Sequence, residues 1–322
     1  MFFGSRRLDA VRKKNTMKTN RIEFNGLSAV EILTDIARMV IVTSLGPRIA
    51  DFRLIGGENI LLWEPGKYKR GHWELVGGHR VWIAGIGADE CEDTYAVDNG
   101  PCEVIITEQE VMVTGALNPV NYTRRGISVS VQHDGLFKVV NFVINEGHPT
   151  EGKMLYAGGI WALTCTVPVE DTMYGVSIGG HPEWDCFNMT VFNRWAGHGQ
   201  GGYDDPQIQL SDHAVLVTPH GRENKRTVQS RRGIIAMSCP SRKLSFAKKV
   251  RFLNGANYPD GCNIAFYIGP HNFMFEMETM GPQVTLRPGE MQKHTEYWAL
   301  KPSPVNLNDP AQLEAMFEGM AS

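Results

Sequence analysis

Two glutamates, Glu276 and Glu278, stand two positions apart in the run FMFEMETMGP. In a β-strand this interval puts both side chains on the same face. Two carboxylates held side by side repel each other, so in a dry pocket at least one of them acquires a raised pKa and can exchange a proton near neutral pH. The alternative is a strand face in contact with water, which is the more common place for charged residues. The pattern by itself favours this second interpretation.

A histidine and an arginine, His79 and Arg80, open the apolar part of the run GGHRVWIA. A guanidinium has a fixed fork of donors that suits carboxylates, phosphates and sugar hydroxyls. Trp82 follows in the same run, and an aromatic ring can pack on the apolar face of a sugar, although tryptophan is also ordinary core material. The polar pair therefore either points into a pocket or ends a strand in water.

No motif in the sequence indicates a metal site or a cofactor. The ten histidines form no HxH or HExxH pattern, and the six cysteines show no CxxC spacing. The sequence also lacks GxSxG, a Walker loop and a GxGxxG motif after a strand. His181 stands with two acids in HPEWD, but turns commonly collect such residues. We therefore expect neither a bound metal nor a cofactor.

The composition argues against several classes of partner. The formal net charge is -3 and the basic runs are short, so we expect no nucleic-acid surface and no polybasic membrane contact. No apolar run reaches the length of about 18 residues that a membrane span requires. The N-terminal stretch lacks the apolar centre of a secretion signal, so we expect a cytoplasmic protein with reduced thiols. The oligomeric state is not indicated.

Strand-like runs dominate the sequence, roughly twenty of them, and many show the alternation of a half-buried antiparallel strand. Only residues 309–321 predict a helix, with Asp309 as its amino-terminal cap and a proline at its first position. Because helices do not alternate with strands, the sequence predicts an all-β fold of two large packed sheets. We expect residues 1–19 to be a flexible extension, with a true start at Met1 or Met17, and residues 20–322 to form one domain.

Five motifs in a fixed order carry a resemblance to a known family. They are GPRIADFRLIGGENILLWEP, GGHRVWIA, TYAVDNGPCEV, NYPDGCNIAFY, and FEMETMGPQVTLRPGE followed by HTEYWAL. This series resembles the galactose mutarotase-like superfamily, which includes aldose 1-epimerases and hexose-6-phosphate 1-epimerases, and within it a bacterial branch. The resemblance covers residues 20–301, and it implies a β-supersandwich with a sugar cleft on one face of a sheet.

The resemblance also implies roles for particular residues. In the relatives, a glutamate before an LxPGE turn removes the proton of the anomeric hydroxyl, and Glu278 is the first counterpart here, with Glu276 second. An arginine after a glycine-rich strand entrance contacts sugar hydroxyls in the relatives, and Arg80 fits that position. Lys249, in the strand before NYPDG, is a further candidate for the pocket.

Two histidines of the family pattern have no match in this sequence. Trp161 stands near the position of the histidine acid, and Asp98 occupies the neighbourhood of the second histidine, so both join the substrate-binding candidates. An indole N–H donates a hydrogen bond but cannot deliver a proton at neutral pH. The candidates for the acid are therefore His79 and His181.

Three functions remain open at this point. The first is an aldose 1-epimerase-like isomerase of carbohydrate metabolism, with Glu278 as the base. The second is a carbohydrate-binding protein without turnover. The third is a lyase or isomerase that acts on a modified sugar or uronate in the same cleft. In each case the expected partner is a small-molecule carbohydrate.

Overall fold

Two large antiparallel sheets pack face to face in this chain. In a computed structural model, the described residues are 17–70, 73–84, 95–132, 135–148, 155–169, 171–179, 187–192 and 202–318. Within them, the strands form one sheet of eleven strands, one of ten strands and a two-stranded ribbon. The prediction of an all-β sandwich is therefore confirmed.

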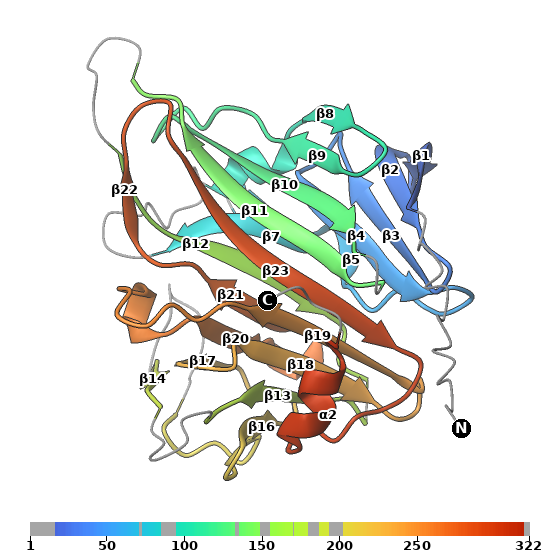
Figure 1. Ribbon diagram of the computed structural model, residues 1–322, viewed down its shortest axis with the longest axis vertical. Coiled ribbons are helices and arrows are strands. Elements are labelled where there is room, and N and C mark those ends of the chain that lie inside the picture. Colours follow the sequence, from blue (N-terminus) through green and yellow to red (C-terminus); the bar gives the residue numbers. More distant parts are fainter. Residues whose placement is uncertain are drawn as a thin grey trace, which may run out of the picture.

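The strands of each sheet come from distant parts of the chain. The first sheet has the order β1 (Lys18–Phe24), β2 (Leu27–Leu33), β3 (Ala37–Val42), β4 (Arg48–Leu54), β7 (His79–Ala84), β12 (Leu155–Thr166), β21 (Phe275–Met280), β20 (Ile264–Ile268), β17 (Asn224–Val228) and β14 (Met189–Val191), with β22 (Val284–Leu286) paired to β12. The second sheet has the order β15 (Ile208–Leu210), β16 (Ala214–Val217), β13 (Met173–Ser177), β18 (Ile234–Cys239), β19 (Leu244–Val250), β23 (Met291–Lys301), β11 (Phe137–Asn145), β10 (Thr123–Val131), β9 (Val111–Thr114) and β8 (Glu103–Ile106). In Figure 1 the second sheet lies in front, with β10, β11 and β23 crossing before β7 and β12.

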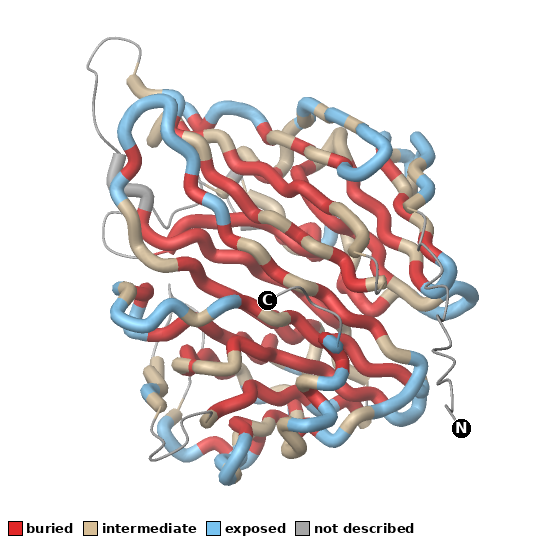
Figure 2. Tube along the Cα trace, in the orientation of Figure 1, coloured by how far each residue is buried: buried red, intermediate tan, exposed pale blue. Residues whose placement is uncertain are grey.

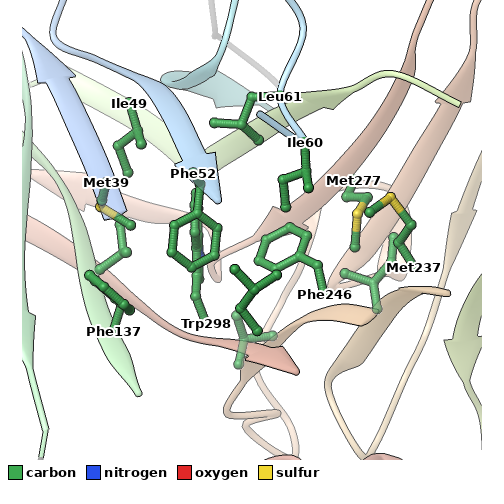
Figure 3. Close-up of a cluster of buried hydrophobic side chains, with 14 of the residues drawn as sticks. Met39, Ile49, Phe52, Ile60, Leu61, Phe137, Met237, Phe246, Met277 and Trp298 are labelled. Carbon is green, nitrogen blue, oxygen red and sulfur yellow. The ribbon is translucent and has the colours of Figure 1, made fainter. Parts of the chain in front are cut away.

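The hydrophobic core fills the space between the two sheets. Phe52 of the first sheet packs against Phe137, Phe246 and Trp298 of the second, with ring centroids 5.2, 5.6 and 5.5 Å apart (Figure 3). Buried residues run along the middle of the strands, and exposed residues gather at the connections (Figure 2). Burial of each such aromatic side chain stabilises the fold by about 1.5–3 kcal/mol.

The central strands of the first sheet are buried on both faces, and the two faces carry different side chains. In β7, Val81 and Ile83 point into the core, whereas Arg80 and Trp82 point away from the second sheet. The same alternation holds in the neighbouring strands, where Trp161, Leu163, Cys165, Glu276, Glu278, Met280, Ala265 and Tyr267 point outward. We call this side the outer face of the first sheet.

A two-stranded ribbon packs over part of this outer face. It consists of β5 (Trp63–Arg70) and β6 (Trp73–Gly77), and Trp73 packs against the apolar side chains of the outer face. The 3₁₀ turn η1 (Ala96–Asn99) also contacts β6 and follows Tyr95, which packs against the same side chains. The outer face is therefore shielded from water although it carries charged residues.

The two glycines before His79 allow the ribbon to join β7. Gly77 and Gly78 have φ angles of 93° and 71°, which side-chain-bearing residues rarely adopt. A Cβ atom at Gly77 would lie 2.3 Å from the carbonyl oxygen of Leu62, and one at Gly78 would lie 2.4 Å from that of Ile49. Glycine is therefore required at both positions, because the backbones of Leu62 and Ile49 lie too close for a side chain at the start of β7.

The C-terminal helix packs on the second sheet. Helix α2 (Pro310–Ala315) begins after Asp309, whose side chain accepts hydrogen bonds from the backbone N–H groups of Ala311 and Gln312. The predicted cap and the proline at the first helical position are therefore confirmed, although the helix is shorter than predicted. Leu313, Met316 and Phe317 are buried against β18, β19 and β23, on the side of the second sheet that faces away from the core.

Candidate functional site

Four charged side chains meet on the outer face of the first sheet. Arg80 comes from β7, Glu276 and Glu278 from β21, and Lys225 from β17. Strand register brings them together, because Leu163 of β12 pairs with both Arg80 and Glu278. We call these four residues the outer charge cluster. Each is at most 6% exposed, and such burial is tolerable only because the charges form two pairs.

The first pair joins Arg80 to Glu276. The distance between Arg80 Nη2 and Glu276 Oε1 is 2.9 Å, and Arg80 Nη1 donates to the sulfur of Cys165 at 3.0 Å. Burial raises the pKa of Cys165 to about 12, so the thiol keeps its proton and donates to Glu276 at 3.4 Å. Glu276 is thereby held by two donors from neighbouring strands.

The second pair joins Lys225 to Glu278. Lys225 Nζ lies 2.7 and 2.6 Å from the two carboxylate oxygens of Glu278, and Trp161 Nε1 donates to the same carboxylate at 2.6 Å. Burial raises the pKa of Glu278, and the attraction of Lys225 only partly opposes this effect. Glu278 therefore accepts a proton more readily than an exposed glutamate does.

Trp82 is enclosed by its neighbours. The Tyr95 ring stacks on it with centroids 3.7 Å apart, and the Arg80 guanidinium carbon lies 4.3 Å from its centroid. Two groups this close to one centroid must cover opposite faces of the ring. The rings of Trp161 and Trp73 also pack against it in T-shaped arrangements, with centroids 5.6 and 5.7 Å from that of Trp82. Trp82 thus orients Arg80 by a cation–π contact, and a sugar can stack on it only after Tyr95 moves.

Asp98 anchors this aromatic group to the end of the sheet. Its carboxylate accepts a hydrogen bond from Trp82 Nε1 and lies 3.9 Å from guanidinium nitrogens of both Arg48 and Arg125. Burial lowers the pKa of Arg48 to about 10, although Asp98 opposes this effect. Asp98 is therefore linked to the outer charge cluster by contact through Trp82, which packs on Arg80, and its charge also raises the pKa of Arg80.

His79 points to the opposite side of the sheet from Arg80. Its two ring nitrogens lie 2.8 Å from Thr164 Oγ1 and 2.8 Å from Asn141 Oδ1, in the space between the two sheets. Burial lowers the pKa of His79 to about 4, with partial opposition from Glu296. The expectation that His79 shares a pocket with Arg80 and supplies the acid is therefore wrong, because adjacent residues of a strand face opposite sides.

A second group of charges occupies the centre of the core. Lys248 Nζ lies 2.7 Å from Glu296 Oε1, and it also donates to Thr164 Oγ1 at 2.9 Å and to the Met277 carbonyl at 3.0 Å. His79 and His294 flank this carboxylate, so we call Lys248, Glu296, His79 and His294 the inner charge cluster. Burial alone raises the pKa of Glu296, but Lys248 and the two histidines lower it to about 2.

Comparison with known proteins relates the chain to solved structures. No protein-family model matches it, and no curated protein matches it in sequence. A TPR-domain-containing protein from Parabacteroides distasonis ATCC 8503 superimposes with a TM-score of 0.57 at 14% identity, over 87% of this chain and 48% of that one. The chain thus spans about half the length of that protein.

Two further solved structures match over nearly their whole length. A galactose mutarotase-like protein from Clostridium acetobutylicum gives a TM-score of 0.53 at 11% identity, over 90% of this chain and 99% of that one. A galactose 1-epimerase from Lactobacillus acidophilus NCFM gives 0.52 at 11% identity, over 89% and 99%. The chain has the galactose mutarotase-like fold. At these identities the likeness shows the fold alone.

The mutarotase-like sandwich places Lys249 far from the outer charge cluster. Lys249 belongs to β19 of the second sheet, where its Nζ lies 2.5 Å from Glu314 Oε2 and 5.6 Å from the centroid of the Phe317 ring. Glu314 belongs to the C-terminal helix and Phe317 comes just after it, and both lie on the side of that sheet that faces away from the core. The expectation that Lys249 lines the pocket is therefore wrong. His181 lies outside the described residues.

Sequence reasoning missed Lys225, Cys165 and Tyr267, which also belong to the outer face. Tyr267 is buried beside the cluster, and its hydroxyl donates to Glu223. Lys225 stands in NKRTV, where polar residues occur on both faces of the strand, so alternation does not single it out. Only its pairing with the strand next to β21 identifies it.

The described residues show no metal centre and no membrane segment. In these parts of the chain, no group of three or more His, Cys, Asp or Glu side chains is arranged to hold a metal ion. Within the same ranges, no helix is long and apolar enough to cross a membrane.

Proposed function

We propose that this protein is an aldose 1-epimerase-like isomerase that binds a small sugar at the outer charge cluster, with Glu278 as its base. The observation that carries the proposal is the contact between Arg80 and Glu276, which are 196 positions apart and lie beside Glu278 on one buried sheet face. The fold supports it, because the galactose 1-epimerase from Lactobacillus acidophilus NCFM has a similar architecture.

The charge pattern suits a neutral sugar. A hydroxyl group both donates and accepts hydrogen bonds, so it can bridge the carboxylate and the cation of one ion pair. Arg80 with Glu276 and Lys225 with Glu278 offer two such donor–acceptor pairs side by side. Because both cations already have carboxylate partners, we assign a neutral aldose as the substrate class in preference to a sugar phosphate.

The chemistry requires a base and a proton donor. In anomer exchange, the base removes the proton of the anomeric hydroxyl while the ring oxygen gains a proton and its bond to C1 breaks. Burial raises the pKa of Glu278, which brings its proton affinity closer to the operating pH and makes it a better base than an exposed carboxylate.

Anomer exchange of pure aldoses tests the proposal. We expect the protein to accelerate interconversion of at least one hexose or pentose, followed by polarimetry and by NMR. Glu278→Gln should lower kcat by about 10²–10⁴-fold, which is the usual contribution of general acid–base catalysis. Glu103→Gln is the matched control, because Glu103 lies on the β8 edge of the second sheet with a side chain that is 73% exposed. The absence of acceleration with any common hexose, pentose or sugar phosphate would reject the proposal.

A carbohydrate-binding protein without turnover is the second candidate. One observation favours it: Glu278 already binds Lys225 and Trp161 with both oxygens, and His79 points to the other side of the sheet. In this case calorimetry should detect saccharide binding while the rate of anomer exchange stays at the uncatalysed value. Loss of a measured turnover in Glu278→Gln would contradict it.

A further inference from the structure

Lys225 touches the base and an aromatic ring at the same time. Its Nζ lies 2.6 Å from Glu278 Oε2 and 4.6 Å from the centroid of the Trp161 ring. Its neighbours in β17 are fixed, because Arg226 Nη1 donates to Asn224 Oδ1 at 2.6 Å and both residues are buried. The two Glu278 oxygens and the Trp161 ring hold the ammonium group on the face where the reaction is proposed to occur.

We propose that Lys225 is the proton donor of this reaction, an inference that rests on the proposed function and assigns the acid that the sequence leaves open. Among the described residues, two other donors of the outer face, Arg80 and Trp161, do not fit this role. A guanidinium such as Arg80 stays protonated in proteins, and an indole such as Trp161 donates hydrogen bonds without releasing its proton. An ammonium group, by contrast, loses and regains a proton in many enzymes.

The proton transfers balance within one cycle. Glu278 takes the proton of the anomeric hydroxyl, and the electrons of that O–H bond form the C=O bond of the open-chain aldehyde. The bond between C1 and the ring oxygen breaks, its electrons stay on the oxygen, and the oxygen takes a proton from Lys225. After rotation about the C1–C2 bond, ring closure reverses both transfers and restores the Glu278 carboxylate and the Lys225 ammonium.

The short contact between the two groups couples these transfers. In the resting site, the Glu278 carboxylate attracts the ammonium of Lys225, which lies 2.7 and 2.6 Å from its two oxygens. When Glu278 takes the proton of the substrate, this attraction disappears, and the ammonium can turn from the carboxylate toward the ring oxygen. Proton uptake by the base thus releases the ammonium from its ion pair at the moment when the ring oxygen needs a proton.

A charge-conserving substitution separates proton donation from ion pairing. Lys225→Arg keeps a cation beside Glu278 but cannot release a proton, so we expect kcat to fall by about 10²–10⁴-fold with little change in KM. Sugar binding measured by calorimetry should persist. Lys138→Arg in β11 of the second sheet is the matched control, and its kcat should equal that of the unaltered protein.

Rescue by small amines gives an independent readout. Lys225→Ala should regain activity in the presence of methylamine or ethylamine, with a rate that depends on the pKa of the added amine. A purely structural cation would not show this dependence. If Lys225→Ala does not fold, the same rescue is applied to Lys225→Gln, which retains a hydrogen-bond donor for Glu278.

The outcomes distinguish this inference from the proposed function. A Lys225→Arg variant with nearly normal kcat, in the assay where Glu278→Gln is inactive, would overturn the role of Lys225 and leave the proposed function standing. A rescue that does not vary with the amine would also overturn it. An unaltered protein that binds a sugar without accelerating anomer exchange would overturn both.

Discussion

At the scale of single residues, each charge of the outer charge cluster lies within 2.9 Å of a buried group of opposite charge. Arg80 and Glu276 are both buried, and so are Lys225 and Glu278. Removing one member of a buried pair leaves the other charge without compensation, which costs far more than removing both. The outer charge cluster therefore consists of two pairs, and a single substitution in a pair has to be compared with the double substitution.

The pair between Arg80 and Glu276 can be tested through stability alone. Arg80→Met should lower the free energy of unfolding by about 3–5 kcal/mol, because Glu276 is left buried beside an apolar side chain. Adding Glu276→Gln to this variant should restore part of the loss. The measurement is urea denaturation, with Arg124→Met as the control, since the Arg124 pair with Glu103 is largely exposed and should contribute about 1 kcal/mol or less. Equal losses in the single and double variants would contradict the prediction.

At the scale of elements, the strands of the first sheet serve two charge clusters at once. His79 and Arg80 are neighbours in β7, yet one belongs to the inner cluster and the other to the outer cluster. In β12, Thr164 contacts Lys248 inside the core, whereas Cys165 contacts Arg80 outside it. Strand alternation thus distributes adjacent residues between two separate charge clusters.

The inner cluster should support the packing of the two sheets. Lys248→Met leaves Glu296 buried without its cation, so we expect the free energy of unfolding to fall by about 3–5 kcal/mol. Lys249→Met is the matched control in the next position, where the partly exposed pair with Glu314 should contribute about 1 kcal/mol or less. Denaturant midpoints compare the two variants. A loss in Lys249→Met as large as in Lys248→Met would argue against this role of the inner cluster.

At the scale of the whole molecule, the inner cluster predicts sensitivity to acid. Burial lowers the pKa of His79 and His294 from 6.5 to about 4, so between these pH values the unfolded chain binds more protons than the folded one. Stability should therefore be full above pH 6.5 and decrease as the pH falls toward 4. The lowered pKa of Glu296, about 2 against 4.5, adds a further loss between those values.

Urea denaturation at a series of pH values measures this effect. We expect the free energy of unfolding to fall by a few kcal/mol between pH 7 and pH 4, since one pKa unit corresponds to about 1.4 kcal/mol. His79→Gln should flatten part of this decrease. A profile for His79→Gln with the same slope as the unaltered protein would show that His79 does not titrate in this way.

The fold could be predicted from the sequence more completely than the site. Alternating strands, frequent turn residues and a single capped helix indicate two packed sheets, because these signals are local in the chain. The site depends on contacts between distant segments, such as that between Lys225 and Glu278, which are 53 positions apart. Adjacency in the sequence groups His79 with Arg80, but the alternation of β7 points their side chains to opposite faces of the sheet. Tertiary register therefore decides which of the polar residues meet.

Strand β21 separates the inner charge cluster from the outer charge cluster. The carbonyl of Met277 holds the ammonium of Lys248 on one side, and the residues before and after it, Glu276 and Glu278, face the other side. Substituting apolar residues for the buried charges of the core, as a way to raise thermal stability, would therefore also affect the opposite face of β21. Any repacking of the core that displaces β21 would also misalign the carboxylates of Glu276 and Glu278 on its other face.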